Sequence, residues 1–306
     1  MGTVDTNYVG LLTEIEPQIA KLVDRHSSLA KEWFPHDYVP YSKGRDFDRD
    51  PWAPAQATLS EASQVAFHVN LLTEDNLPSY HRLIHAMFDK GDGAWRHWIH
   101  QWTAEEGRHA IVIRDYLMVT RNIDPIALER GRMQTMTRGY ERPDCPLRGL
   151  AYTSFQELAT RVSHLNTGKS SGDPVAERLM TRVAQDENLH MVFYRDALGI
   201  AFEVNPSAVM KAITAEVIGF QMPGAGIAGF GHMANIMAAN GIYNMRIHHD
   251  EIVAPLLRFW KVYDRTGLDD EALAARDKLA SFVARLDRAA TKLDERARLA
   301  LQKPAA

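Results

Sequence analysis

The chain has 306 residues, of which 45% are hydrophobic and 24% charged, a composition typical of a globular protein with a sizeable core. Its formal net charge is −4 at pH 7, which argues against a dedicated nucleic-acid-binding protein. The only cysteine, Cys145, excludes intramolecular disulfides, iron–sulfur clusters and thiolate zinc sites. A bound metal ion would therefore need His, Asp and Glu ligands.

No targeting or membrane segment is expected. The first twenty residues lack the basic start and apolar run of a signal peptide. The longest uncharged stretch, residues 217–245, contains several glycines and asparagines, a histidine and a proline, so we predict no membrane span. A chain with one cysteine and no signal peptide is predicted to be cytoplasmic.

Helical periodicity extends over most of the sequence, and the alternation typical of strands is absent. The segments predicted to be helical are 9–31, 59–89, 93–121, 123–138, 147–168, 173–200, 206–220, 249–265 and 269–301. No shift in composition marks a domain boundary. We therefore predict one mainly helical domain over residues 1–306, with a core bundle at about 59–200, an N-terminal helix and connector at 9–58, and C-terminal helices at 206–301.

The last two predicted helices carry notable charges. Asp250 and Glu251, which follow two histidines, fit a helix start near Ile252. The final helix has an apolar stripe. From Arg276 onward the sequence contains eight Lys and Arg residues but only four Asp and Glu residues. We interpret this basic excess as the solvated face of a packing helix; the alternative is a docking surface for an acidic partner.

Two Glu-x-x-His pairs, Glu106–His109 and Glu187–His190, indicate chemistry in the core. Residues at i and i+3 share one face of a helix, and in both pairs this face is otherwise apolar. A buried carboxylate without a partner costs several kcal/mol, so each pair needs compensation. A metal ion would supply it.

A lone glutamate precedes each pair by a similar interval: Glu74 lies 32 residues before Glu106, and Glu157 lies 30 residues before Glu187. Two helical hairpins related by a pseudo-twofold axis would bring these glutamates and both pairs together. One Glu from each of two helices with Glu-x-x-His from the other two is typical of ferritin-like di-iron or di-manganese proteins. The sequence therefore predicts an all-α, ferritin-like bundle, with further helices flanking its four-helix core.

The charges of this predicted site favour two metal ions. Four carboxylates balance two divalent ions with both imidazoles neutral, and carboxylate and imidazole ligands suit iron or manganese better than structural zinc. Pro78 follows Glu74 by four residues, which predicts either a distorted helix or a helix end. Asp186 could accept a hydrogen bond from His109, and Glu105 from His190; alternatively both are exposed charges.

Five segments resemble the soluble acyl-acyl carrier protein desaturases of plant plastids and actinobacteria, the actinobacterial branch most closely. They are WFPHDY at 33–38, TEDNLPSY at 73–80, WTAEEGRH at 102–109, YTSFQELAT at 152–160 and DENLH at 186–190. The resemblance extends from about residue 10 to 260 and leaves out the final helix.

The resemblance implies a role for each candidate site residue. The metal ligands would be terminal carboxylates at Glu74 and Glu157, bridging carboxylates at Glu106 and Glu187, and one imidazole per iron at His109 and His190. Thr160 would be a candidate for proton delivery to bound oxygen. Asp186 with Trp33 would form a candidate electron route toward His109.

The resemblance also implies an activity. Two irons per chain, reduced by a ferredoxin-type donor, would use O₂ to introduce a cis double bond into a saturated acyl chain on acyl carrier protein, in fatty acid biosynthesis. A homodimer is expected. Two alternatives remain: another di-iron oxygenase, such as a hydroxylase or N-oxygenase, on the same scaffold, and a ferritin-type iron-binding protein. The long helices after residue 200 argue against the second alternative.

Overall fold

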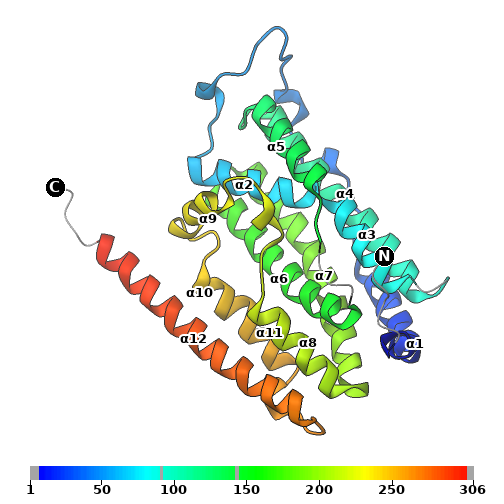
Figure 1. Cartoon of the computed structure of the whole chain (residues 1–306). Helices are drawn as coiled ribbons and strands as arrows, with labels where there is room; N and C mark the ends of the chain where they lie inside the picture. The colour runs from blue at the N-terminus through cyan, green and yellow to red at the C-terminus, as the bar shows by residue number, and fades with distance from the viewer. Residues whose placement is uncertain (1–6, 90–91, 142–144, 302–306) are drawn as a thin grey trace.

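The computed structural model describes residues 7–89, 92–141 and 145–301, and every regular element within these ranges is helical (Figure 1). The longer helices are α1 (Asn7–Leu29), α2 (Glu61–Glu74), α3 (Leu77–Phe88), α4 (Ala94–Val119), α5 (Pro125–Arg138), α6 (Pro146–Ser170), α7 (Pro174–Val204), α8 (Pro206–Ile218) and α12 (Asp270–Leu301). The shorter ones are α9 (Phe230–Ala239), α10 (Met245–Ile247) and α11 (Ala254–Phe259). The predicted all-α fold is confirmed.

Helices α2, α4, α6 and α7 form the core of the bundle, and α6 and α7 pack side by side through its centre (Figure 1). Local signals define where these helices begin. Pro146 and Pro174 occupy first-turn positions, where a missing N–H costs nothing, and the Asp173 side chain accepts a hydrogen bond from the Val175 amide. The long core helices therefore start at fixed points and present matching faces to one another.

A polar layer divides the apolar core of the bundle. The N-terminal half of α4 and the C-terminal half of α7 belong to one buried apolar cluster, which includes Trp98 and Phe193. The other halves of these two helices belong to a second cluster, which includes Tyr116 and Val183. The segments between the halves, residues 105–109 and 186–190, are the predicted motif segments. The motifs thus lie in the middle of the bundle, enclosed by apolar side chains on both sides.

The predicted helix at 59–89 is two helices. Helix α2 ends at Glu74, and α3 starts at Leu77 with Pro78 in its first turn. Pro78 has no N–H to donate to the Glu74 carbonyl, so the helix cannot continue through this point. Of the two outcomes expected from Pro78, the structure has the helix end.

The prediction for residues 249–265 is wrong at its N-terminal boundary. Asn244 caps the helical segment, because its side chain accepts a hydrogen bond from the Ile247 amide at 2.9 Å. The segment continues from α10 through a π-helical stretch, His248–Val253, into α11. Asp250 and Glu251 therefore lie inside the helix rather than capping it. Helix α9 was not predicted, because glycines and asparagines within and around it weaken the helical pattern.

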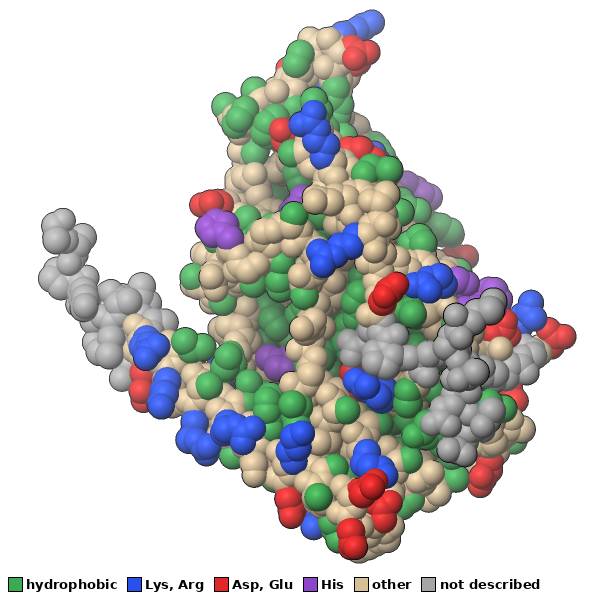
Figure 2. All heavy atoms as spheres, in the orientation of Figure 1, with side chains coloured by type: hydrophobic (Ala, Val, Ile, Leu, Met, Phe, Trp, Pro, Cys, Tyr) green, Lys and Arg blue, Asp and Glu red, His purple; other side chains and the backbone are tan. Residues whose placement is uncertain are grey.

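Helix α12 lies along one edge of the molecule and packs on α8 and α10 (Figure 1). Its apolar stripe is buried at Leu279 and Ala290, whereas Leu293 is 46% exposed. Arg246 of α10 binds Asp287 at 2.7 Å on the inner side. Lys and Arg side chains line the outer side (Figure 2), and those at 278, 285, 288, 292 and 296 are exposed. The basic residues thus lie on the exposed face of a helix that packs on the rest of the molecule.

Within the described ranges, no helix has both the length and the apolar character needed to cross a bilayer.

Candidate metal centre

The six predicted ligands converge in the polar layer of the bundle. One group of ligand atoms within 4.8 Å of one another comes from Glu74, Glu106, Glu187 and His109. A second such group comes from Glu106, Glu157, Glu187 and His190. Glu106 and Glu187 belong to both groups, whereas each of the other four residues belongs to one. The geometry therefore describes two adjacent sites that share two carboxylates.

Distances within the cluster are short. The Nδ1 atom of His109 lies 3.2 Å from Glu106 Oε2 and 3.4 Å from Glu187 Oε1. The Nδ1 atom of His190 lies 2.7 Å from Glu106 Oε1 and 3.8 Å from Glu157 Oε2. Each of the two imidazoles thus directs its Nδ1 atom toward the shared carboxylates.

Several buried polar atoms in this cluster make no hydrogen bond to the rest of the described chain. They include the Nδ1 atoms of both histidines and one oxygen each of Glu106, Glu157 and Glu187. Buried polar groups are normally hydrogen-bonded, so this concentration of unpaired nitrogen and oxygen atoms indicates that the cluster binds a ligand such as a metal ion. Two divalent ions would bind these atoms and balance the four carboxylate charges. The residues therefore fit a pair of metal ions.

The pKa values of the carboxylates are displaced in both directions. Burial and the neighbouring Glu187 raise the pKa of Glu106, and burial together with Glu106 raises the pKa of Glu157 well above its usual value. Burial opposes ionisation of Glu187 as well, but the rings of His109 and His164, whose nitrogens lie 3.4 and 3.3 Å from its Oε1, hold its pKa well below the usual value. Without metal, the cluster shares protons between carboxylates that cannot all ionise together.

The metal-free protein is expected to lose stability between about pH 6.5 and pH 10. Burial alone would lower the pKa of His190, but Glu106 and Glu105 raise it to about 10; Glu187 and Glu74 likewise raise the pKa of the buried His164 to about 9. Both folded-state values exceed the unfolded value of 6.5, so this stabilisation is complete below about pH 6.5 and is lost as the pH rises through 9 to 10.

The slope would reach about 1.4 kcal/mol per pH unit for each proton involved. Glu106 and Glu157, with raised pKa values, act in the same direction. Thermal unfolding of chelator-treated and metal-loaded protein across this pH range would measure the effect. Bound metal would replace these protons, so the stability of the metal-loaded protein should depend much less on pH. An equal dependence in both forms would contradict the assignment of these groups to the metal centre.

Asp186 links one histidine of the cluster to Trp33. The Trp33 indole N–H donates to Asp186 Oδ2 at 2.7 Å, and the same oxygen lies 3.5 Å from His109 Nε2. Arg182 and Arg108 also contact this carboxylate, and Arg108 stacks over the Trp33 ring. On the other side of the cluster, Glu105 Oε2 lies 2.9 Å from His190 Nε2. The hydrogen bond expected between His190 and Glu105 is present, whereas His109 Nε2 approaches Asp186 without making a hydrogen bond to it.

Other side chains hold the cluster in place. Thr160 Oγ1 donates to Glu187 Oε2 at 3.1 Å, and the Trp102 indole donates to Glu157 Oε1 at 3.1 Å. His164, which the sequence did not single out, is fully buried, and its Nε2 lies 3.1 Å from Glu74 Oε1. It follows Glu157 by seven residues on α6, so it shares the face of that glutamate. That spacing was the available signal.

A cavity adjoins the cluster between α3, α4 and α6. Glu74 and Glu106 line its inner side, next to Trp102. Away from the cluster its walls are mainly residues of α3 and α6: Leu77, Tyr80, Leu83, Ile84 and Met87 from α3, and Gly149, Tyr152, Thr153 and Gln156 from α6. Leu77 and Met87 are ten positions apart on α3, which corresponds to a rise of about 15 Å along the helix. The cavity is therefore long, mainly apolar and open to the carboxylates.

A helical bundle whose four core helices supply two lone glutamates and two Glu-x-x-His pairs belongs to the ferritin-like carboxylate class. The family described as "Fatty acid desaturase" matches residues 7–305. This chain belongs to that family, among its acyl-acyl carrier protein desaturases.

Three relatives illustrate this membership. The chain is 45% identical to the "Putative acyl-[acyl-carrier-protein] desaturase DesA1" of Mycobacterium tuberculosis, over 93% of this chain and 87% of that protein. It is 30% identical to the chloroplastic stearoyl-[acyl-carrier-protein] 9-desaturase of Spinacia oleracea, over 90% and 73%. The X-ray structure of the "putative acyl-ACP desaturase DesA2" of M. tuberculosis superposes with a TM-score of 0.71 at 26% identity, covering 87% of this chain and 99% of that one.

Proposed function

We propose that the protein is an O₂-dependent desaturase that introduces a cis double bond into a saturated acyl chain carried on acyl carrier protein. The observation that supports this best is the position of the apolar cavity, whose inner wall includes two of the cluster's carboxylates, Glu74 and Glu106. An extended acyl chain in this cavity would place its methylenes beside the proposed metal pair. Desaturases among the relatives act on carrier-bound acyl chains according to their names.

We further propose two irons per chain, held by Glu74, Glu106, His109, Glu157, Glu187 and His190. When bound, the iron pair would supply the redox chemistry for O₂ activation that amino-acid side chains lack. Two electrons from a ferredoxin-type donor and two protons would enter for each O₂. Two hydrogens would leave adjacent methylenes, and two water molecules would form. The partners of the proposed reaction are thus the acyl carrier protein, the donor and O₂, and we expect a homodimer.

The roles of the surrounding residues follow from their contacts. Thr160 donates its hydroxyl hydrogen to Glu187, so it holds a proton at the edge of the cluster and is the proposed proton donor. The electron path that we propose runs from Trp33 through its hydrogen bond to Asp186 and across a 3.5 Å contact to His109. The apolar side chains of α3 exclude water from the reacting methylenes.

Product analysis tests this function directly. Purified protein reconstituted with ferrous ion would be incubated with a ferredoxin, its reductase, O₂ and saturated acyl carrier proteins. Mass spectrometry of the released acyl chains should show a loss of about 2 Da per chain, which corresponds to two hydrogens. A gain of one oxygen atom would instead identify a hydroxylase on the same scaffold. A multi-subunit shell that stores iron without acyl turnover would identify the ferritin-type alternative.

Two substitutions at one contact are expected to shift chain-length preference in opposite directions. A Cβ atom at Gly149 would lie 2.8 Å from Met87 Sδ, so these two cavity-lining residues pack directly against each other. Met87→Ala should open the cavity and favour longer chains, whereas Gly149→Ala should push Met87 into it and favour shorter ones. Each methylene gained or lost is worth about 0.8 kcal/mol, or about fourfold in kcat/KM.

Competition assays with acyl chains of graded length would measure both variants. Both lie away from the proposed ligands, so iron content should stay at the wild-type value and serves as the internal control. If both variants shift the chain-length preference in the same direction, or neither shifts it, the acyl chain does not occupy this part of the cavity.

A further inference from the structure

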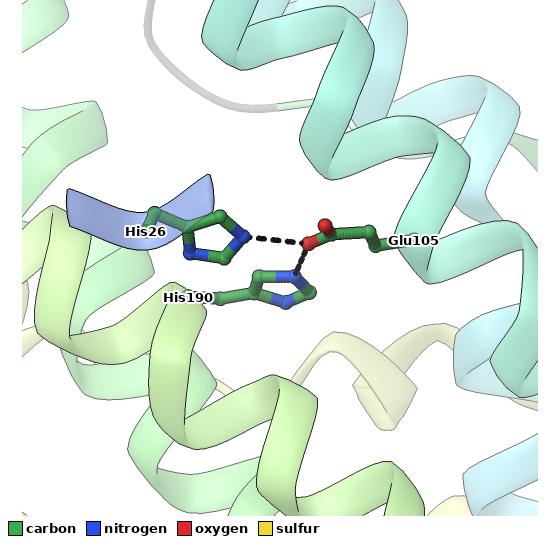
Figure 3. A group of neighbouring side chains, drawn as sticks. All are labelled: His26, Glu105 and His190. Carbon is green, nitrogen blue, oxygen red and sulfur yellow. Dashed lines mark hydrogen bonds and ion pairs between the residues drawn. The ribbon is translucent and has the colours of Figure 1, made fainter. Parts of the chain in front are cut away.

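His26 joins the proposed metal centre from outside the four-helix core. It belongs to α1, and its Nε2 lies 2.9 Å from Glu105 Oε2. The same oxygen lies 2.9 Å from Nε2 of His190, so three helices meet at one carboxylate oxygen (Figure 3). His26 is only 4% exposed, although it lies on a helix at the periphery of the bundle. We propose that His26 is a positioning residue that acts through Glu105 to orient His190 for metal binding.

Hydrogen-bond chemistry determines which ring nitrogens carry protons. A carboxylate oxygen accepts hydrogen bonds, and both Nε2 atoms lie 2.9 Å from the same oxygen of Glu105. Both Nε2 atoms therefore donate. A neutral His190 with its hydrogen on Nε2 keeps a lone pair on Nδ1, the atom that faces Glu106 and Glu157. The contact thus selects the tautomer a metal would need.

The packing around His26 keeps its ring in place. The ring meets Trp98 edge to face, with centroids 4.9 Å apart and an interplanar angle of 85°. It also lies nearly parallel to the His190 ring, at 5.8 Å between centroids and 20°. An aromatic wall and a parallel imidazole leave this side chain little rotational freedom. It can therefore hold the Glu105 carboxylate in one orientation.

The other half of the cluster shows why Glu105 needs such a partner. Asp186, the corresponding carboxylate behind His109, is held by two arginines and Trp33. Within the described ranges, Glu105 makes no ion pair with Lys or Arg; apart from the two histidines, it accepts one hydrogen bond, from Gln101 at 3.3 Å. Losing His26 would remove one of only three orienting contacts and leave Glu105 free to turn toward water.

The inference depends on the proposed iron centre but not on the acyl substrate. The test uses iron-reconstituted protein and three variants: His26→Phe, which keeps a ring of similar size without a donor; His26→Gln, which restores an N–H donor; and His36→Phe, a control at an exposed histidine of the same N-terminal segment. Iron retention against a graded chelator and the Mössbauer spectrum are measured, with circular dichroism as the check on folding.

In His26→Phe, affinity for one iron should fall about 10- to 100-fold, the usual cost of losing an outer contact to a ligand, and one of two Mössbauer components should change. His26→Gln should recover most of the affinity, and His36→Phe should match the wild type. Equal iron loss in His26→Gln and His26→Phe, or unchanged iron binding in both, would overturn the inference.

The iron content of the wild type and of His26→Phe distinguishes a positioning role for His26 from direct metal binding, and also separates failure of this inference from failure of the proposed function. The side chains of His26, Glu105 and His190 also lie close enough together to hold an ion themselves. A third iron per chain that is lost in His26→Phe would therefore overturn the positioning role. A wild-type protein that binds no iron would overturn the proposed function itself, whereas two irons in the wild type with no effect in the variants would overturn only the role of His26.

Discussion

Glu106→Gln is expected to weaken iron binding by more than about 100-fold while stabilising the metal-free protein by about 1–2 kcal/mol. Glu106 belongs to both groups of ligand atoms, so its loss affects both proposed metal positions. Without metal, however, the carboxylate is buried beside Glu187, and both burial and this neighbour raise its pKa. A neutral amide of the same shape removes that unfavourable charge, so the two effects have opposite signs.

Thermal unfolding with and without ferrous ion would measure both effects in one experiment. The wild type should gain stability on iron addition, because a ligand that binds only the folded state shifts the unfolding equilibrium. The Glu106→Gln variant should unfold at a higher temperature than the wild type without iron, and its unfolding temperature should rise little when iron is added. His190→Ala should also lose iron and activity while keeping the helical circular dichroism signal. A Glu106→Gln protein with full iron content would show that Glu106 is not a ligand.

Asp186→Asn is expected to cost about 3 kcal/mol of folding free energy. Asp186 is 3% exposed, and its carboxylate contacts Arg182, Arg108 and the Trp33 indole. Removing one partner of a buried ion pair leaves uncompensated charge, which typically costs about 3–5 kcal/mol. The lower end applies because Arg108 is partly exposed. The variant should also weaken iron binding at the His109 position about 10-fold or more.

Urea unfolding of iron-free protein would measure the stability change separately from metal binding. Asp196→Asn is the matched control, because Asp196 lies on the same helix and also contacts two arginines, Arg25 and Arg195, but nearer the surface. Exposed ion pairs contribute about 0–1 kcal/mol. Similar losses in the two variants would mean that burial of Asp186 does not create the expected energetic difference.

The helical fold and the candidate ligands could be predicted because they depend on local spacing. Glu106 and His109 fall on one face of any helix that contains them, and so do Glu187 and His190. The near-equal intervals back to Glu74 and Glu157 match two hairpins of similar length. Boundaries were less predictable where one residue type was compatible with two structures: Pro78 with a kink or a helix end, and Asp250 with a cap or an interior position.

The sequence by itself determined which residues can share a helical face, and with it the class of bundle and the identity of the six candidate ligands. Only the tertiary structure decided how those faces meet. It placed the Glu74 carboxylate at the end of α2, brought His164 and His26 against the cluster, and opened an apolar cavity beside Glu106. Such contacts join residues more than 70 positions apart, and their distances depend on how helices pack, which no local periodicity encodes.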